Sequence, residues 1–306
     1  MKTGNIWSKK VPEAQEQQEA LESKQEVFSS PVEQLITKEG FEDVNVIDLK
    51  DIVQIYGDKP NQNVIFDGFN LEIKDIVAKG QFVAIMGKSG CGKSTILRYI
   101  SGLQKPTSGE VLIYGQPRKS GQSIPMVFQQ YSSFEWMSVL DNVALPLLIN
   151  GVEKSKAREK AMEMINIVGL SGHENKWAKY PILSGGQLQR VAIARSLVAN
   201  PQILLMDEPF GALDIVTRKQ MQMFMRSIFE ADNALDPTTI LVTHSESEAV
   251  FLASDILILD SGPASIRYHI KIDLPDIRDN SVRKSTRFTE LVNEVRDKME
   301  AIELEK

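Results

Sequence analysis

The stretch FVAIMGKSGCGKST, residues 82–95, decides the fold expected for this chain. Its apolar start predicts a buried strand, and a glycine-rich loop and the beginning of a helix follow directly. In such a loop the backbone N–H groups and the helix N-terminus converge on phosphate, so glycines are needed where a Cβ would block the approach. A glycine-rich turn with a chance lysine is the alternative, but it would not need the flanking strand and helix. The stretch therefore predicts a phosphate-binding P-loop.

Each position of the loop has an expected task. Lys93 should reach the β- and γ-phosphates of a nucleotide, and Ser94 should offer its hydroxyl to Mg²⁺. Thr95 and the loop amides should hold the α- and β-phosphates. The loop residues expected to contact the nucleotide are Gly87, Ser89, Gly90, Cys91, Gly92, Lys93, Ser94 and Thr95.

Cys91 is the single cysteine of the chain, which excludes an intrachain disulfide and fits a reducing compartment. It lies beside Lys93 and a helix N-terminus, surroundings that can lower the pKa of a thiol. We therefore expect alkylation of Cys91 to block nucleotide binding. The alternative is that Cys91 is only a small residue at a permissive position.

Strand-like and helical stretches alternate on both sides of the loop. Strands are expected at 44–56, 63–73, 82–86, 110–114, 124–128, 203–206, 239–243 and 255–260. Helices are expected at 94–101, 154–168, 184–198, 214–229 and 246–252. The apolar run at 203–206 suits a parallel strand buried on both faces. This alternation is typical of an α/β sheet with right-handed crossovers.

Two adjacent carboxylates, Asp207 and Glu208, end the strand at 203–206. Open α/β sheets bind ligands at the carboxyl ends of their strands. Asp207 suits Mg²⁺, usually through water, because hard cations take oxygen ligands. Glu208 points elsewhere and can orient or deprotonate an attacking water. A solvated acidic turn is the alternative, which the P-loop disfavours.

The stretch LSGGQLQR, residues 183–190, begins one of the expected helices. Ser184 could cap this helix, and Gln187 three residues later could complete a capping box. A serine cap does not need two glycines, however, so Gly185 and Gly186 indicate that something besides folding favours bare backbone here.

Together these motifs resemble the ABC-type ATPases. Residues 87–95 resemble the Walker A motif, 203–208 the Walker B motif and 183–190 the LSGGQ motif particular to that family. The resemblance covers 44–260 and implies an α/β fold with a P-loop NTPase core, an antiparallel β subdomain and a helical subdomain at about 130–198. In this family the LSGGQ motif closes over the γ-phosphate of an ATP held by the other subunit. The resemblance thus places Ser184, Gly185, Gly186 and Gln187 on ATP at an interface with a second ATPase subunit, identical or paralogous.

The resemblance also assigns positions outside these motifs. Tyr56 matches the aromatic residue that stacks on adenine, although it could equally be a core residue. Gln129 matches the Q-loop glutamine, with Gln130 as the alternative register. Asp214 matches the D-loop aspartate of the dimer interface, and His244 the switch histidine that binds the γ-phosphate. The implied catalytic residues are Glu208, His244, Gln129 and Lys93, and the implied Mg²⁺ ligands are Ser94, Gln129 and Asp207.

Within the family, three stretches resemble the importer ATPases of the nitrate, sulfonate and taurine type: DEPFGALD (207–214), FEWMSVLDNVALPL (134–147) and IDLPDIRD (272–279). Lys88, Glu135 and Ser245 depart from the residues usual in that group. The implied function is ATP hydrolysis coupled to solute uptake through membrane permease subunits, with a solute-binding protein involved indirectly. Tyr131, Phe134, Trp136 and Met137 suggest a groove for a short permease helix, although part of this set could fill the core instead.

Two other functions fit parts of the sequence. A non-transport ABC ATPase for DNA repair, chromosome structure or translation usually carries a long coiled-coil insert or a second ATPase unit, and neither is visible in the sequence. A regulatory module that binds ATP without turnover is disfavoured by Glu208 and His244. The chain has 35 basic and 41 acidic residues, a formal net charge of −6, which offers no footprint for nucleic acid.

The ends of the chain carry separate expectations. Residues 1–43 are rich in Gln, Glu, Lys and Ser, so they predict a mobile or partly helical arm. The first residues lack the apolar core of a secretory signal, so export is not expected. No stretch reaches the roughly 20 apolar residues of a membrane span. The chain is therefore expected at the cytoplasmic face of the cell membrane, held there by its permease. Residues 261–306 predict a strand and a helix that pack on the ATPase domain at 44–260, with an apolar stripe of Phe288, Leu291, Val292, Val295, Met299 and Ile302.

Overall fold

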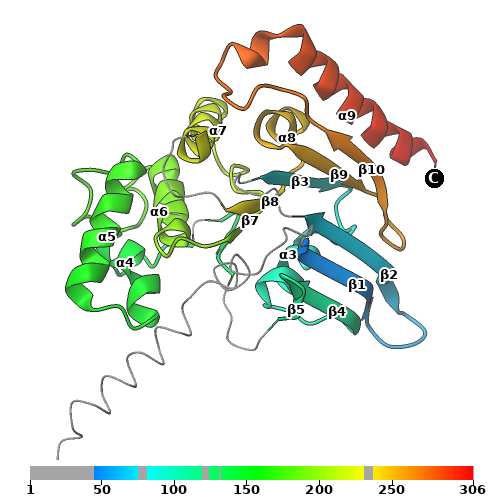
Figure 1. Ribbon diagram of the computed structural model, residues 1–306, viewed down its shortest axis with the longest axis horizontal. Coiled ribbons are helices and arrows are strands. Elements are labelled where there is room, and N and C mark those ends of the chain that lie inside the picture. Colours follow the sequence, from blue (N-terminus) through cyan, green and yellow to red (C-terminus); the bar gives the residue numbers. More distant parts are fainter. Residues whose placement is uncertain (1–44, 75–80, 119–123, 131, 231–236, 306) are drawn as a thin grey trace, which may run out of the picture. The chain divides into compact units, whose positions relative to one another are not determined.

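A computed structural model describes residues 45–74, 81–118, 124–130, 132–230 and 237–305 (Figure 1). The arm predicted at 1–43 and the aromatic residue at 131 lie outside the described residues. Among the described helices, none is long and apolar enough to cross a membrane.

The larger sheet has six strands in the order β10-β9-β3-β8-β7-β6. Its strands are β3 (Phe82–Gly87), β6 (Met126–Val127), β7 (Ile203–Asp207), β8 (Thr238–Val242), β9 (Asp255–Leu259) and β10 (Ile266–Lys271). All neighbouring pairs are parallel except β10 with β9, which are antiparallel. The carboxyl ends of five strands therefore meet at one edge, as predicted for an α/β sheet.

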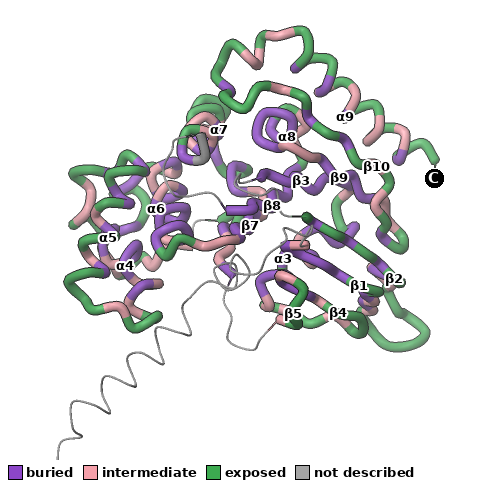
Figure 2. The backbone as a smooth tube through the Cα atoms, viewed as in Figure 1, coloured by how far each residue is buried: buried purple, intermediate pink, exposed green. Residues whose placement is uncertain are grey.

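Side chains of the central strand β3 alternate between two hydrophobic cores. Val83 and Ile85 pack on one side with the smaller sheet and helix α3 (Lys93–Ser101). Ala84 and Met86 pack on the other side with α7 (Ile215–Glu230), α8 (Glu246–Leu252) and the helical part of the chain. Figure 2 shows the buried sheet between these layers. A strand with two apolar faces can only be accommodated in this way.

The smaller sheet is antiparallel, in the order β2-β1-β4-β5. It consists of β1 (Asn45–Tyr56), β2 (Asn63–Lys74), β4 (Ser108–Ile113) and β5 (Gln116–Pro117). Phe66 of β2 reaches the P-loop so closely that a Cβ on Gly92 would lie 2.4 Å from the ring. Gly92 also has a φ of 99°, which side chains rarely tolerate, so glycine is required here on two counts.

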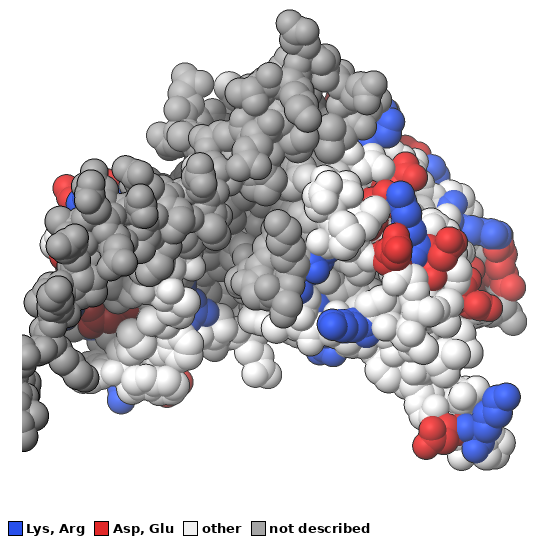
Figure 3. All heavy atoms as spheres, turned by 60° about the horizontal axis from the view of Figure 1, so that its bottom comes forward, with Lys and Arg blue, Asp and Glu red and all other residues white. Residues whose placement is uncertain are grey.

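Charges of both signs cover the exposed side of the described structure shown in Figure 3. Basic and acidic side chains interleave there. This pattern gives that face no extended area of one sign.

The helical part contains α4 (Val139–Ile149), α5 (Lys154–Ile167) and α6 (Gly185–Leu197). The apolar face predicted for α5 is confirmed, because Ala157, Ala161, Met164, Ile165 and Val168 are all buried. The sequence did not indicate α4 as a helix, since Asp141, Asn142 and Pro146 interrupt its apolar pattern.

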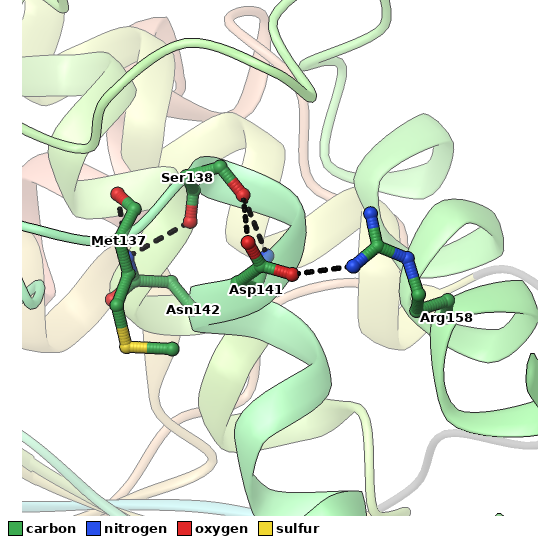
Figure 4. A network of polar contacts seen from close by, with 5 residues as sticks. All are labelled: Met137, Ser138, Asp141, Asn142 and Arg158. Carbon is green, nitrogen blue, oxygen red and sulfur yellow. Dashed lines mark hydrogen bonds and ion pairs between the residues drawn. The ribbon is translucent and has the colours of Figure 1, made fainter. Parts of the chain in front are cut away.

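Asn142 explains how α4 tolerates a buried amide. Its Nδ2 donates to the backbone carbonyls of Phe134, Met137 and Ser138 at 3.0, 3.3 and 3.0 Å. Its Oδ1 accepts from the Phe134 N–H at 2.8 Å. Figure 4 shows the neighbouring cap of α4, in which the Ser138 hydroxyl accepts from the Asp141 N–H at 3.1 Å and Arg158 pairs with Asp141 at 2.6 Å. The loop before α4 is thus fixed by side chains of α4 itself.

The C-terminal segment adds the edge strand β10, a short 3-10 turn η1 (Val282–Lys284) and helix α9 (Thr286–Leu304). The predicted stripe on α9 is confirmed: Phe288, Leu291, Val295 and Ile302 are buried, and Val292 and Met299 pack partly buried against the same core. Ser285 caps the helix by accepting from the Phe288 N–H at 3.2 Å.

Replacing Asn142 by alanine should lower the free energy of unfolding by about 1–3 kcal/mol, because it removes the acceptor of the Phe134 N–H and a donor to the carbonyls of Phe134, Met137 and Ser138. Asn293→Ala on the exposed side of α9 makes the same chemical change and should cost less than about 0.5 kcal/mol. Urea unfolding followed by circular dichroism measures both. Equal midpoints for the two variants would contradict this account of the loop.

Candidate functional site

The carboxyl edge of the larger sheet gathers the residues predicted for phosphate chemistry. The P-loop leaves β3, Asp207 and Glu208 leave β7, and His244 follows β8. These three strands are direct neighbours in the order β3-β8-β7, so their exits lie next to one another. Gln129 follows β6, the next strand along.

Lys93 lies folded over the P-loop. Its buried ammonium donates to the carbonyls of Gly87 and Lys88, each at 2.8 Å. An ammonium has three donors, so one remains for an anion within the loop. The backbone thus positions the positive charge where the loop amides converge.

Ser94 and Asp207 meet across the site. The Ser94 hydroxyl donates to Asp207 Oδ1 at 3.0 Å. Burial raises the pKa of Asp207, and the hydrogen bond from Ser94 opposes that rise. A hydroxyl and a carboxylate oxygen are the donors that Mg²⁺ takes, with phosphate oxygens and water completing its shell. Among the described residues there is no cluster of three or more His, Cys, Asp and Glu side chains that could hold a metal ion.

Glu208 and His244 face each other. Their Oε1 and Nε2 atoms lie 2.6 Å apart, and about 43% of the histidine side chain is exposed. Glu208 has a φ of 46°, a rare conformation for a non-glycine residue. Its N–H donates to the Val242 carbonyl of β8 at 2.9 Å, so the adjacent strand holds this backbone in place. Asp207 and Glu208 therefore point to different partners, as the sequence indicates.

Gln129 and Asp214 lie near the stretch that follows Glu208. The Gln129 amide reaches to 3.1 Å from where a Cβ on Gly211 would lie, so the two segments are in contact. Asp214 accepts from the N–H groups of Val216 and Thr217, each at 3.0 Å, and these bonds with the Thr217 side chain lower its pKa. Asp214 thus caps α7.

Arg218 was missed by the sequence reasoning. Its guanidinium donates to the carbonyls of Phe210 and Leu213 at 3.1 and 3.0 Å and holds the stretch between Glu208 and Asp214. A lone arginine in a helix gives no periodic or spacing signal that could reveal this task.

Tyr56 lies at the end of β1, with about 41% of the residue exposed. Its hydroxyl accepts from Gln104 Nε2 at 2.7 Å, another contact that the sequence did not indicate. The ring is therefore an exposed, oriented surface rather than a core residue.

The capping box considered for the LSGGQ stretch is confirmed. Ser184 and Gln187 form a capping box: the serine hydroxyl accepts from the Gln187 N–H at 3.3 Å, and Gln187 Oε1 accepts from the Ser184 N–H at 2.9 Å. Gly186 has a packing reason of its own, because a Cβ there would lie 2.7 Å from Thr217 of α7.

This end of α6 borders a cavity of about 290 Å³ between α6 and α7. The cavity is lined by Gly169, Ser184, Gly186, Gln187, Arg190, Thr217, Gln220 and Met221. None of the P-loop residues lines it, so the structure does not bring the LSGGQ stretch of this chain to its own P-loop.

The expected activation of Cys91 is wrong. The thiol is buried, and this burial raises its pKa more than Lys93 and the loop amides lower it. Its sulfur packs close to Gly87, so Cys91 is a small core residue of the loop.

Comparison with known proteins decides the family. Residues 71–211 match the family profile described as ABC transporter. Over 211 residues, 68% of this chain and 83% of the relative, the sequence is 44% identical to the aliphatic sulfonates import ATP-binding protein SsuB of Zymomonas mobilis. This chain belongs to the ABC transporter family.

Other ABC proteins agree over longer spans. The chain is 37% identical to the aliphatic sulfonates import protein SsuB 1 of Agrobacterium fabrum over 277 residues, 90% of each chain. It is 39% identical to the nitrate import ATP-binding protein NrtD of Synechocystis over 231 residues, 75% of this chain and 83% of that one. The solved dimeric ABC transporter cassette MJ0796 is 32% identical, with a TM-score of 0.60 over 76% of this chain and 99% of that one. The fold predicted from the motifs is confirmed, and the chain is an ATPase of this family.

The raised pKa of Cys91 leads to slow alkylation. Because less thiolate forms and burial limits access, iodoacetamide at pH 8 should label the folded protein at least about tenfold more slowly than the protein in guanidinium chloride. Mass spectrometry of quenched samples gives both rates. Equal rates would show that the thiol is activated and exposed after all.

Proposed function

We propose that this chain is the ATP-hydrolysing subunit of an ABC importer. Two ATP molecules bind at the interface of two such subunits, and hydrolysis drives solute uptake through membrane permease subunits. The observation that carries the proposal is the split of the site: the P-loop, Asp207, Glu208 and His244 share one sheet edge, while the LSGGQ stretch borders a separate cavity. A second subunit is needed to supply that stretch.

Within one subunit, the chain's own residues divide the work on ATP. Lys93 and the loop amides bind the phosphates, and Tyr56 offers its ring to adenine. Ser94 and Asp207, with Gln129, would hold Mg²⁺, which neutralises charge on the phosphates when bound. Glu208 accepts a proton from the attacking water, and His244 contacts the γ-phosphate from the neighbouring strand.

From the facing subunit, Ser184 and the N–H groups at Gly185 and Gly186 close over the γ-phosphate. Without a phosphate between them, the two sets of phosphate-binding groups do not stabilise the closed dimer, so closure depends on ATP. The cassette MJ0796 has been solved as a dimer, which supports this arrangement. Hydrolysis removes the bridging charge and releases the pair.

The surface beside Gln129 suits a permease. Trp136 is about 72% exposed, and its ring lies 5.3 Å from that of Phe134. Arg195 of α6 supports this loop by donating to the Ser132 hydroxyl at 2.7 Å, and Asn142 holds the loop from α4. A rigid loop with an exposed tryptophan is what a short helix of a membrane partner can pack against.

The solute class follows from the relatives named for import. These carry aliphatic sulfonates and nitrate, which are small anions, so we infer a small oxyanion as the solute. The permease and a solute-binding protein select it, because this chain acts only on ATP. The subunit accordingly works at the cytoplasmic face of the membrane. The same relatives favour import over a non-transport role.

Glu208→Gln tests the catalytic assignment. Removing the base should lower kcat for ATP at least about 100-fold while ATP binding persists. The variant should then stay dimeric in ATP, which light scattering after size-exclusion chromatography measures. Glu159→Gln on the exposed face of α5 is the matched control and should behave as wild type. ATP hydrolysis by Glu208→Gln at the wild-type rate would remove Glu208 from this role.

Purification of a tagged full-length chain from detergent-solubilised membranes tests the transport role. A polytopic membrane protein should co-purify and raise the ATPase rate. Trp136→Ser should lose this partner, whereas Leu304→Ser, which removes an equally exposed apolar side chain from the end of α9, should retain it. An ATPase that never associates with a membrane protein would overturn the importer assignment.

A further inference from the structure

The segment between β10 and α9 runs along the helices that follow the nucleotide site (Figure 1). Its side chains bond to α8, which begins directly after His244, and to α7, which begins directly after Asp214. Each helix is continuous with a loop that we assign to the ATP site.

Arg278 closes the end of α8. Its buried guanidinium donates through Nη1 to the carbonyls of Val250, Phe251 and Ala253 at 3.1, 3.0 and 2.8 Å. The last carbonyls of a helix lack partners within the helix and carry its negative partial charge, so a cation there is stabilising. Arg278 thereby links the C-terminal segment to the end of α8, the helix that follows His244.

Arg283 reaches α7 from the same segment. It donates through Nη2 to Gln222 Oε1 at 2.6 Å, and its guanidinium lies 3.5 Å from the centre of the Phe251 ring of α8. Burial lowers the pKa of Arg283 to about 10, with Glu248 opposing the shift, so the group is charged at neutral pH.

Gln222 connects Arg283 to Glu248 by hydrogen bonds to both. Since its Oε1 accepts from Arg283, its Nε2 is directed to Glu248 Oε2, at 2.7 Å. Only about 3% of Gln222 and 3% of Glu248 is exposed. The orientation of the glutamine amide is therefore set from the C-terminal segment.

Glu248 in turn binds the residues on both sides of His244. Its backbone N–H donates to the Ser245 hydroxyl at 3.4 Å. Burial raises the pKa of its carboxyl, and hydrogen bonds with the side chains of Thr243 and Gln222 oppose that rise. Thr243 Oγ1 also accepts from the Ser245 N–H at 3.1 Å. A buried carboxylate is costly unless it is fully bonded, so Glu248 fixes the backbone at 243–245 only while its partners stay in place.

Resting on the proposed function, we propose that Arg283 and Arg278 are positioning residues for ATP hydrolysis. Through Gln222, Glu248 and α8 they hold His244 against Glu208. The C-terminal segment thus acts as a brace that holds the switch histidine in position. Gln222 connects this brace to α7, the helix that Asp214 caps.

The expected effect is on the chemical step. His244 acts on the γ-phosphate, and a small misplacement of such a group slows chemistry far more than it weakens ATP binding. Arg283→Met in the full-length chain should lower kcat at least about tenfold and change KM for ATP by less than about twofold. Arg283→Lys keeps the charge and one donor and should restore part of kcat.

A second variant and a matched control separate the brace from general loss of stability. Gln222→Met interrupts the connection to Glu248 at similar volume and should lower kcat in the same way. Arg287→Met removes an exposed arginine from the first turn of α9, whose partners Asp273 and Glu290 are also exposed, and should leave kcat unchanged.

Histidine NMR supplies a readout that a purely structural role would not change. The chain has only three histidines, His173, His244 and His269, so their ring resonances can be assigned by substitution. In both Arg283→Met and Gln222→Met, the His244 resonances should move while those of His173 and His269 stay.

The outcomes are distinct. If both variants keep kcat within about twofold of wild type, or if their His244 resonances do not move, the brace is overturned. If the wild-type chain hydrolyses no ATP, or His244→Ala hydrolyses it at the wild-type rate, the proposed use of the site fails instead. An equal shift of all three histidines would indicate a general change of structure and would also overturn the brace.

Discussion

Parallel pairing of β3, β8 and β7 is the constraint on which the site depends. Val242 of β8 lies opposite Ile85 of β3 on one side and opposite Asp207 of β7 on the other. The three strands therefore reach the same level of the sheet and release the P-loop, the acidic pair and the histidine at one edge. A slip of one residue would exchange the side chains of a strand between two cores, so burial on both faces fixes this register. Apolar packing of the strands therefore sets the geometry of the site.

Glycine meets different demands in the two phosphate-binding motifs. Gly92 must adopt a left-handed conformation against the Phe66 ring, and this close contact joins the smaller sheet to the P-loop. Gly186 must let α6 approach Thr217 of α7. Bare backbone at Gly186 thus serves packing within one chain, and on the proposed function it also serves a phosphate from the facing subunit. Ser184 likewise caps a helix and remains exposed.

Much of the fold and the centre of the site could be predicted from the sequence, because both depend on local patterns. An apolar strand followed by a glycine-rich loop, or by paired carboxylates, defines its surroundings within a few residues. The α4 helix could not be predicted, since its polar Asn142 is satisfied only by a loop that folds back on it. Nor could the sequence show that Cys91 is buried deeply enough to outweigh the neighbouring positive charge. The contact of Gln222 with Glu248 joins two separate helices and leaves no periodic signal. The bonds of Arg218 to the preceding turn leave none either.

The pairing of His244 with Glu208 bears on how hydrolysis is linked to dimer closure. In the arrangement described, His244 Nε2 lies 2.6 Å from Glu208 Oε1, so a γ-phosphate must compete with Glu208 for the same nitrogen. On the proposed function, the exchange of that partner is also the event that frees Glu208 to accept a proton from water. ATP can favour the exchange only by as much as it binds the closed state more tightly, and the LSGGQ stretch of the facing subunit adds to that difference. The buried Glu248 holds the backbone on both sides of His244. The position of His244 before ATP binds is therefore set by α8 and not by the nucleotide. On the proposed function, this pairing is a resting state in which Glu208 and His244 hydrogen-bond to each other until a phosphate and a second subunit bind together.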